Sequence, residues 1–402
     1  MDDAPLRWID GQREAMTRLL RDWSAINSGS RNLAGLARMC DAIRAEFASL
    51  GGEMRLLRLE PEQVIDSGGN AVAAPLGQAI SIVKRPSAPA RVLLNIHYDT
   101  VFGPDHPFQS VWQPDADTLV GPGVVDAKGG LVVMLAALRA FEQSSAAERL
   151  GWEVFINPDE EVGSPGSSPL LRAAAARNRV GLLFEPAMSD GNLVGARKGS
   201  GNFTAVVRGR AAHAGRDFHQ GRSAIVALAD LISRIDAMQA ELEGTTINCG
   251  KVEGGGALNI VPDLAIGRFN ARAGTPEQAR VIESRFADLV REVAHARDGI
   301  TIDLHGGFHA PPKVLDDPTT RLMNVILDAA RELGMNLTHQ PSGGASDGNK
   351  LAAAGLPVVD TLGPVGGNLH SDREFVKISS LTERAKLTAL VLMKFASGAW
   401  GA

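Results

Sequence analysis

The chain has 402 residues, 44% of them hydrophobic and 22% charged, a composition typical of a globular protein with more than one domain. A net charge of −5 and an isoelectric point near 6.0, without any basic cluster, argue against nucleic acid as a partner. No apolar run reaches the roughly 18 residues that a membrane helix needs, and the acidic start MDDAPLRWIDGQRE lacks the pattern of a signal peptide.

The two cysteines, Cys40 and Cys249, lie far apart in the chain, and neither belongs to a Cys-x-x-Cys pair. We interpret them as free thiols without a catalytic role, although the sequence alone leaves a pairing between them open. Free thiols are typical of a reducing compartment. Together with the missing leader and membrane span, this predicts a cytoplasmic protein that binds no membrane.

The outer parts of the chain predict an α/β domain. The first fifty residues have the apolar spacing of helices, which Gly51-Gly52 ends. Short apolar runs then alternate with helical patterns, as expected for a mostly parallel central sheet flanked by helices. The predicted strands are Arg91–Ile96, Trp152–Ile156, Val180–Phe184 and Pro357–Thr361, and the predicted helices are Gly130–Phe141, Pro169–Arg177 and Thr319–Leu333.

The middle of the chain follows a different order, β-α-β-β-α-β, which is typical of a ferredoxin-like α+β domain. Its second helix has a clear start, with Thr275 as the N-cap, Pro276 at the first helical position and Gln278 completing a capping box. We expect residues 198–307 to form an inserted domain, and residues 1–197 and 308–402 to form one discontinuous domain around it. The predicted elements of the insert are Asn202–Arg208, Arg222–Leu242, Thr245–Val252, Leu264–Ala271, Pro276–Arg297 and Thr301–Leu304.

Histidines and carboxylates recur where the strands of the outer domain end. Ligands of open α/β sheets bind beyond the carboxyl ends of the strands. Histidine and carboxylate are the ligand types of Zn²⁺ and similar divalent cations, so their convergence predicts a metal site. The residues are His97 and Asp99, Asp126 in the loop Gly123–Gly130, Glu160 and Glu161, Glu185, and His370.

The charges of this set favour two metal ions. If Asp126 bridges them, His97 and Glu185 would complete one site, and Glu161 and His370 the other. Three carboxylates and a bridging hydroxide would then balance two divalent cations. Asp99 is better placed to orient the His97 ring than to bind metal.

The stretch INPDEEVGS contains adjacent glutamates. On an extended segment such neighbours point in opposite directions, so both cannot face one ion in the same way. We expect Glu161 to be a metal ligand and Glu160 to be the general base that takes a proton from the metal-bound water and returns it to the leaving amine.

These motifs, in this order, resemble the M20 family of metallopeptidases. The matching residues are His97-Tyr98-Asp99, the loop from Gly123 to Gly130, the Glu160-Glu161 pair, Glu185 and His370, and the likeness extends over nearly the whole chain. Their spacing resembles that of the carboxypeptidase G2 (glutamate carboxypeptidase) branch. The resemblance implies a zinc-exopeptidase-like catalytic domain with two Zn²⁺ ions, a lid domain that forms a homodimer, and a cis peptide bond after Asp126. Co²⁺ or Mn²⁺ would also suit an oxygen-rich site with two imidazoles.

The resemblance also implies roles for residues outside the metal site. His213, in GRAAHAG, would reach the neighbouring subunit's site and stabilise the oxyanion. Asn259 and Arg272 match positions that contact substrate, and the Arg272 guanidinium suits the α-carboxylate of the released amino acid. The loop Ser342–Asn349, with Gly344 and Ser346, resembles the family's substrate loop.

The function that follows is hydrolysis of the amide bond of an N-acyl amino acid or a C-terminal peptide bond. A deacylase of the acetylornithine, succinyl-diaminopimelate or aminoacylase type is the alternative. No lysine stands near Gly191-Asn192-Leu193 to pair with a glutamate side chain, and nothing selects among the basic residues that could replace it, namely Arg197, Lys198, Arg210 and Arg216. Glutamate specificity therefore stays open.

Two other readings remain. Gly344-Ala345-Ser346-Asp347-Gly348 fits the G-x-S-x-G pattern of serine hydrolases, with Asp360 and His370 following in that order. The segment HQPSGG is a poor strand to precede a nucleophile, and the metal-ligand residues would have no purpose. A non-catalytic metal-binding dimer on the same fold is the other reading, and the presence of Glu160, a non-ligand, argues against it.

Overall fold

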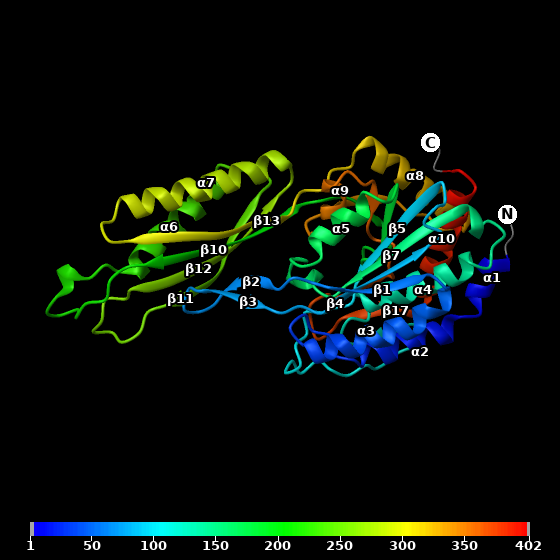
Figure 1. The fold of residues 1–402 in the computed structure, drawn as a ribbon, viewed down its shortest axis with the longest axis horizontal. Coiled ribbons are helices and arrows are strands. Elements are labelled where there is room, and N and C mark those ends of the chain that lie inside the picture. Colours follow the sequence, from blue (N-terminus) through cyan, green and yellow to red (C-terminus); the bar gives the residue numbers. More distant parts are fainter. Residues whose placement is uncertain (1–3, 400–402) are drawn as a thin grey trace.

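The computed structural model describes residues 4–399, and these form two bodies that lie side by side (Figure 1). The larger body is built from both ends of the chain, and α1 and α10 lie at its end away from the smaller body. Chain segments cross between the bodies where β9 (Leu193–Arg197) passes into β10 (Gly199–Arg208) and where β13 (Thr301–Ala310) returns. The chain is therefore an α/β catalytic domain with an inserted lid domain, as predicted.

A six-stranded sheet forms the centre of the catalytic domain, in the order β1-β4-β7-β5-β8-β15. The four strands predicted from apolar runs pair in parallel, and they are β5 (Ala90–His97), β7 (Leu150–Asn157), β8 (Val180–Leu183) and β15 (Val358–Val359). Two antiparallel strands that were not predicted, β4 (Gln78–Lys84) and β1 (Glu53–Arg58), extend the sheet beyond β7. Strand β1 lies at the edge, and its polar, half-exposed sequence has no apolar run.

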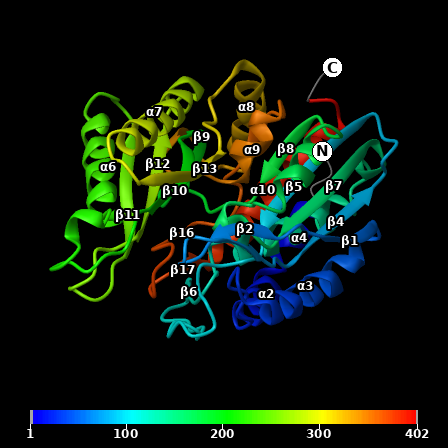
Figure 2. The ribbon, with the colours of Figure 1, turned by 60° about the vertical axis from the view of Figure 1, so that its left-hand side comes forward.

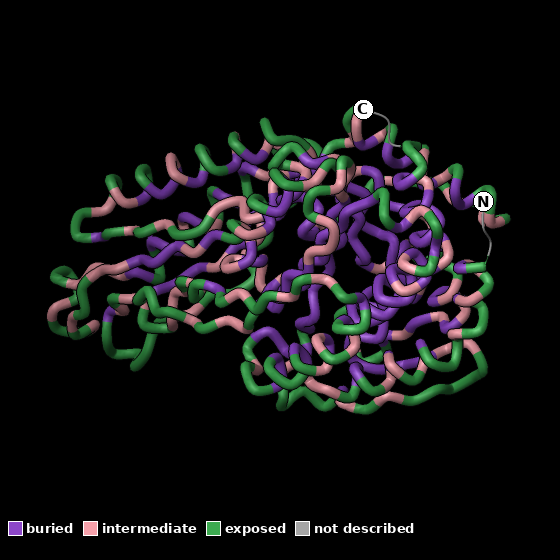
Figure 3. The backbone as a smooth tube through the Cα atoms, turned by 45° about the vertical axis from the view of Figure 1, so that its right-hand side comes forward, coloured by how far each residue is buried: buried purple, intermediate pink, exposed green. Residues whose placement is uncertain are grey.

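Helices cover both faces of this sheet. Alternate residues of β5 enter separate cores, because Val92, Leu94 and Ile96 pack in the larger cluster and Leu93 in the smaller one. In Figure 3 the buried residues are concentrated in the interior of the larger body. The larger cluster includes α1 (Ala4–Asp10), α2 (Arg13–Ser24), α3 (Leu33–Phe47), α4 (Lys128–Phe141), α8 (Asp317–Glu332) and α10 (Ile378–Ala396), and the smaller cluster includes α5 (Ser168–Ala175) and α9 (Asp347–Ala353).

The lid domain has the predicted β-α-β-β-α-β order and a four-stranded antiparallel sheet, β11-β12-β10-β13. Its other elements are α6 (Ala224–Gln239), β11 (Thr246–Gly254), β12 (Leu264–Ala273) and α7 (Pro276–His295). Thr275 and Gln278 form the predicted capping box at the start of α7. Both helices lie on one face of the sheet and enclose the domain's own core (Figure 2).

A hairpin of the catalytic domain reaches the other face of the lid sheet (Figure 1). It consists of β2 (Glu62–Ile65) and β3 (Ala71–Ala74), which the sequence did not reveal. Arg208 donates to the backbone oxygen of Gly69 at 2.8 Å, and Arg268 donates to that of Ile65 at 2.9 Å. The lid is thus attached at three places, the two chain crossings and this hairpin.

Short elements complete the fold. They are β6 (Thr118–Val120), β16 (Gly366–Gly367) and β17 (Phe375–Lys377) in one small sheet, β9 and β14 (His339–Ser342) in another, and the 3₁₀ turns Ala48–Leu50, Ala147–Arg149, Glu160–Val162 and Phe218–Gln220. Both cysteines are free thiols. Within residues 4–399 we find no helix long and apolar enough to cross a membrane.

Candidate active site

The carboxyl ends of the parallel strands bring the predicted ligand residues together. His97 is the last residue of β5, Glu161 lies in the turn after β7, and Glu185 follows β8. Asp126 comes from the loop that opens α4, and His370 from the loop between β16 and β17. Residues more than 270 positions apart in sequence thus share one edge of the sheet, as expected for this topology.

Asp126 lies between the two histidines. Its Oδ1 is 3.2 Å from Nε2 of His97, and its Oδ2 is 3.3 Å from Nε2 of His370. Nε2 of His370 is also 3.3 Å from Oε2 of Glu161, and Nε2 of His97 is 3.9 Å from Oε1 of Glu185. The two oxygens of one carboxylate therefore face two different histidines, each of which has a glutamate nearby, and a carboxylate placed in this way is suited to bridge two ions.

Asp99 links His97 to the glutamate pair. Nδ1 of His97 is 3.3 Å from Oδ1 of Asp99 and donates to the backbone oxygen of the same residue at 3.0 Å, which leaves Nε2 facing Asp126. The Asp99 carboxylate also accepts the backbone N–H groups of Glu160 and Glu161, both at 3.1 Å, and the Ser30 hydroxyl at 2.7 Å. Asp99 is fully buried, so it fixes the ring and the glutamate turn relative to each other.

Glu374 holds the loop that carries Asp126. Its buried carboxylate accepts the backbone N–H groups of Gly123, Val125 and Asp126 at 3.1, 2.9 and 3.0 Å. The peptide bond between Asp126 and Ala127 is cis, as the family resemblance implied. Burial, with Asp126 nearby, raises the pKa of Glu374 to about 8.

The glutamate pair differs from our expectation in its backbone. Residues Glu160–Val162 form a 3₁₀ turn, so the argument from an extended segment is wrong. The turn ends at Gly163, whose φ of 94° favours glycine. The two side chains have different neighbours. Glu161 pairs with His370, whereas Glu185 is the charged residue with the largest influence on the pKa of Glu160.

Burial shifts the pKa values of the ionisable groups in this cluster. It raises the pKa of Glu185 to about 8, and burial and Asp126 together raise the pKa of Glu161. The pKa of Glu160 is raised by burial and by Glu185. Hydrogen bonds with Asp126 and Glu161 raise the pKa of His370 to about 11. So many acids in one place require added positive charge to be ionised together.

The donor set suits divalent metal ions. Single ligand atoms of His97, Asp126 and Glu161 lie within 4.8 Å of one another. Oε1 of Glu161 is buried and has no hydrogen-bond partner among the described residues, which leaves it available to a cation. Imidazole with carboxylate is the ligand combination of zinc, cobalt and manganese sites.

Two cavities meet at the glutamate pair. The acyl-side cavity, as we name it from here on, has a volume of about 440 Å³ and is bordered by Asp126, Glu185, His370 and Arg197. The amine-side cavity has a volume of about 200 Å³ and is bordered by Arg272, His309 and Lys350. Glu160, Glu161 and Ala345 line both cavities.

Among the predicted substrate residues, Arg272, Gly344 and Ser346 lie at these cavities. Arg272 and Ser346 line the amine-side cavity, and Gly344 the acyl-side cavity. Ser346 is buried, caps α9 and donates to Asp360 at 3.3 Å. Within residues 4–399, Ser346 has no hydrogen bond to a histidine, so the arrangement needed for a serine nucleophile is not formed.

His213 and Asn259 are not brought to the site within one chain. Both are exposed and lie on neighbouring loops, where the backbone N–H of Ala214 donates to the backbone oxygen of Asn259 at 2.9 Å. These loops follow β10 and β11 at the end of the lid remote from the catalytic domain (Figure 1).

Several residues at the site were not singled out from sequence. His309 and Lys350 border the amine-side cavity, and Glu374 supports Asp126. His309 and Lys350 are single basic residues without a spacing pattern, so neither could be recognised without the fold. Glu374, two residues after Asp372 in the HSDRE segment, could have been suspected from its place behind a predicted ligand.

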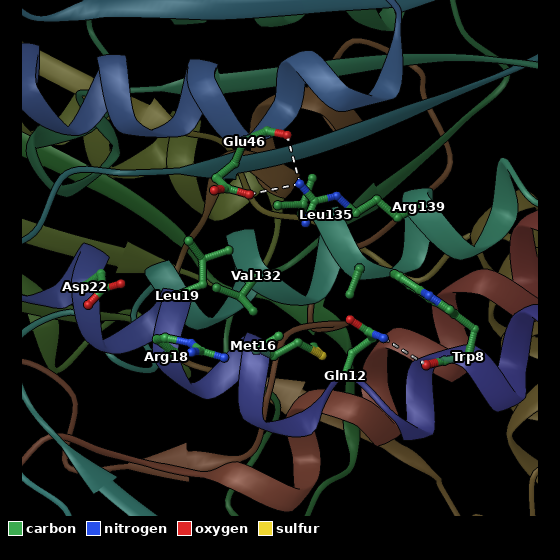
Figure 4. A pocket seen from close by; sticks show the side chains of 12 residues that line it. Trp8, Gln12, Met16, Arg18, Leu19, Asp22, Glu46, Val132, Leu135 and Arg139 are labelled. Atoms are coloured by element: carbon green, nitrogen blue, oxygen red, sulfur yellow. Dashed lines mark hydrogen bonds and ion pairs between the residues drawn. The ribbon is translucent and has the colours of Figure 1, made fainter.

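A further cavity, of about 250 Å³, lies on the surface between α2, α3 and α4 (Figure 4). Trp8, Gln12 and Met16 line it, and Arg139 on its wall pairs with Glu46 at 2.9 Å. It shares no lining residue with the two cavities at the glutamate pair.

Comparisons with known proteins identify the family and the fold of this chain. The family model Peptidase family M20/M25/M40 matches residues 93–394. Carboxypeptidase G2 of Pseudomonas sp. (strain RS-16) is 25% identical over 390 residues, which cover 96% of this chain and 91% of that protein. Succinyl-diaminopimelate desuccinylase of Shewanella piezotolerans is 28% identical over 284 residues, covering 66% and 71%. The structure of an M20 family metallo-carboxypeptidase from Sulfolobus solfataricus superposes with a TM-score of 0.74 at 16% identity, covering 95% of this chain and 99% of that one.

Proposed function

The chain belongs to peptidase family M20, and from this premise we propose that it hydrolyses the amide bond between an acyl group and an amino acid that carries a free α-carboxylate. The bond would lie at the glutamate pair, with the acyl group in the acyl-side cavity and the amino acid in the amine-side cavity. Arg272 would bind the α-carboxylate. Its Nε donates to Asn270 at 2.9 Å, and its two terminal nitrogens have no hydrogen bond to another described residue.

The observation that carries the proposal is that Glu160 borders both cavities. A water that attacks the carbonyl carbon must lose a proton, and the nitrogen of the breaking C–N bond must gain one. A carboxylate that reaches both halves of the substrate can take the first proton and deliver it to the second position. Burial and the nearby Glu185 raise the pKa of Glu160, which favours its carrying a proton between the two steps.

His97, Asp126, Glu161, Glu185 and His370 would hold two divalent cations, with Zn²⁺ as the proposed ion. When bound, these ions would acidify water and polarise the scissile carbonyl. The residues around them have a separate task, which is to keep the ligands in place before metal arrives. Asp99 does this by accepting hydrogen bonds from the His97 ring and from the backbone of the glutamate pair. Glu374 does it by accepting three from the backbone of the Asp126 loop.

We also propose that the protein is a homodimer formed through the lid. Strand β11 is the edge of the lid sheet, and an unpaired edge readily pairs with another strand. Exposed apolar side chains accompany it, namely Phe218, Ile225, Val226, Val252, Leu258 and Ile260. A dimer through this surface would cover them and would explain why His213 and Asn259 lie far from their own chain's site.

The experiment that tests the proposed function is amino-acid release from a panel of N-acyl amino acids, with and without a metal chelator. The panel includes acidic, basic and neutral leaving groups. We expect chelator-sensitive release that Glu160→Gln abolishes while metal content is unchanged. Release unaffected by chelator and by Glu160→Gln would overturn the proposal. Covalent labelling of Ser346 by a fluorophosphonate would instead favour a serine hydrolase.

The same panel separates the two branches of substrate. Release of one acidic amino acid would support a glutamate carboxypeptidase-like activity, and release of a basic or neutral one would support a deacylase. Binding of two metal ions without release from any member would favour a non-catalytic dimer.

A further inference from the structure

The basic groups at the two cavities differ in how well they are already neutralised. In the amine-side cavity, Lys350 donates to Asp347 at 2.9 Å and to Ser164 at 3.2 Å, and this pair is buried. Burial, with Lys350 and Arg272 close by, lowers the pKa of His309 to about 4, so this ring is neutral near pH 7. Arg272 is then the cation left for a substrate anion there, and the α-carboxylate uses it.

In the acyl-side cavity, the basic groups are less completely neutralised by the carboxylates that they are hydrogen-bonded to. Nε of Arg197 donates to Oδ2 of Asp360 at 2.8 Å, and Nζ of Lys313 donates to the same oxygen at 3.1 Å. Lys313 and Asp360 are fully buried, and Arg197 is 8% exposed. Two cations therefore share one carboxylate. The Asp360 carboxylate balances one of these two positive charges. Arg197 is the member that borders the cavity, and it is otherwise influenced by the metal-site carboxylates of Glu185 and Glu160, to which it has no ion pair.

The guanidinium of Arg197 is held in a fixed position with one nitrogen uncommitted. Nε is bonded to Asp360, and Nη1 donates to the backbone oxygen of Gly344 at 3.1 Å. Nη2 has no hydrogen bond among residues 4–399. A guanidinium fixed along one edge and open at the other is preorganised to bind a carboxylate.

Within one chain, the other basic residues that could serve this purpose lie away from both cavities. Nζ of Lys198 donates to the backbone oxygen of Gly244 in the lid. Arg210 donates to Gln220 within the exposed loop at the far end of the lid, and Arg216 lies on the same loop. None of the three lines either cavity.

We propose that Arg197 selects the acyl half of the substrate, and that the preferred acyl group carries a carboxylate at its far end, as N-succinyl and N-glutaryl groups do. This rests on the proposed function, because the orientation of substrate follows from Arg272 holding the α-carboxylate. The acyl-side cavity is also lined by the apolar side chains of Met188, Val194 and Leu369. A short methylene chain with a terminal carboxylate suits a cavity that offers both kinds of surface.

The test compares two substrates that differ in one charge. The N-glutaryl derivative of an amino acid is matched with the glutaramyl derivative, in which an amide replaces the terminal carboxylate. We expect the wild type to prefer the glutaryl compound by about tenfold or more in kcat/KM, the effect of one hydrogen-bonded charge. Arg197→Gln should abolish the preference by lowering kcat/KM for the glutaryl compound alone. Lys198→Gln, which also removes one positive charge, should retain it.

A binding measurement makes the test independent of turnover. Titration calorimetry on the metal-loaded protein compares glutarate with glutaramate, and we expect about tenfold tighter binding of glutarate, lost in Arg197→Gln. Equal affinity of the wild type for both would overturn the proposal, as would an Arg197→Gln variant that weakens both ligands alike. If Arg197→Gln does not fold, the wild-type comparison and Arg197→Lys, which keeps the charge, decide the question. Lack of hydrolysis of both substrates, with the preference for glutarate retained, would refute the proposed function and leave Arg197 as a carboxylate-binding residue of this cavity.

Discussion

The two groups of residues assigned to the active site are held in different ways. The catalytic-domain residues are buried and tied to one another, so that Asp99 alone accepts hydrogen bonds from Ser30 and from the backbone of Glu160 and Glu161. His213 and Asn259 on the lid are exposed and contact none of them. The first group can assemble within a single chain, whereas the second needs another copy or a large movement. Substitutions in the two groups should therefore disturb different properties of the protein.

The largest effect is expected at Glu160, whose backbone is hydrogen-bonded to Asp99 but whose side chain is not a proposed metal ligand. Glu160→Gln keeps the shape and removes the proton carrier, so kcat should fall by about 10³-fold. Metal content, measured by mass spectrometry, should stay at the wild-type value. Activity within tenfold of the wild type would show that another group moves the proton.

The next largest effect is expected at His213, which lies on the lid away from the catalytic-domain residues of its own chain's site. His213→Ala should lower kcat by about 10²-fold or more, as loss of an oxyanion donor does, while metal content and thermal stability stay unchanged. If His213 acts across the dimer, mixing this variant with Glu160→Gln and allowing subunits to exchange should restore activity to about a quarter of the sites. A mixture that stays inactive would mean that His213 acts within its own chain.

A smaller effect is expected at Asp99, whose task is to hold other residues. Asp99→Asn should weaken metal binding by about 10- to 100-fold, because the His97 ring and the glutamate turn lose a shared acceptor. Ser30→Ala removes one hydrogen bond to the same carboxylate and serves as the matched control, with a smaller loss. Competition with a chelator measures both. Unchanged affinity in Asp99→Asn would mean that the backbone oxygen at this position is sufficient for His97.

The smallest effect concerns stability at acid pH and His309, which lies where β13 returns to the catalytic domain. Burial, Lys350 and Arg272 lower its pKa to about 4, while the unfolded chain would titrate near 6.5. The unfolded chain therefore binds a proton on this ring that the folded chain does not bind. As a result, the free energy of unfolding decreases as the pH falls from about 6.5 towards 4. Between pH 7 and pH 4.5 this residue should account for about 2 kcal/mol of that loss.

Urea denaturation of the wild type and His309→Asn at both pH values measures the difference, and the variant should lose less stability. An equal loss in both proteins would place the acid sensitivity at other groups.

The convergence of the proposed metal ligands could be predicted from sequence, because the topology places the carboxyl ends of the strands together and brings in residues such as His97, Glu161 and Glu185 that are far apart in the chain. The ferredoxin-like order and the Thr275 cap were likewise local patterns. Arg197 could be named as a candidate but not chosen, because its importance depends on its sharing the Asp360 carboxylate with Lys313, which only the fold shows. The hairpin escaped notice because its turn, Asp66 to Asn70, and its short strands have no apolar run to mark them. The turn at Glu160 was misread as extended because three acidic residues give no helical signal.

The hairpin β2–β3 has a mechanical consequence. Its tip is bonded to the lid through Arg208 and Arg268, while its base packs on the segment that carries Glu160, where Leu59 and Leu76 surround Gly166. A rotation of the lid about its two chain crossings must either break the arginine bonds or bend the hairpin. In the second case the strain would reach the base of the hairpin, which lies a few residues from Glu160, the proposed proton carrier. The hairpin would thereby transmit a change in the position of the lid to the part of the site where the proposed reaction takes place.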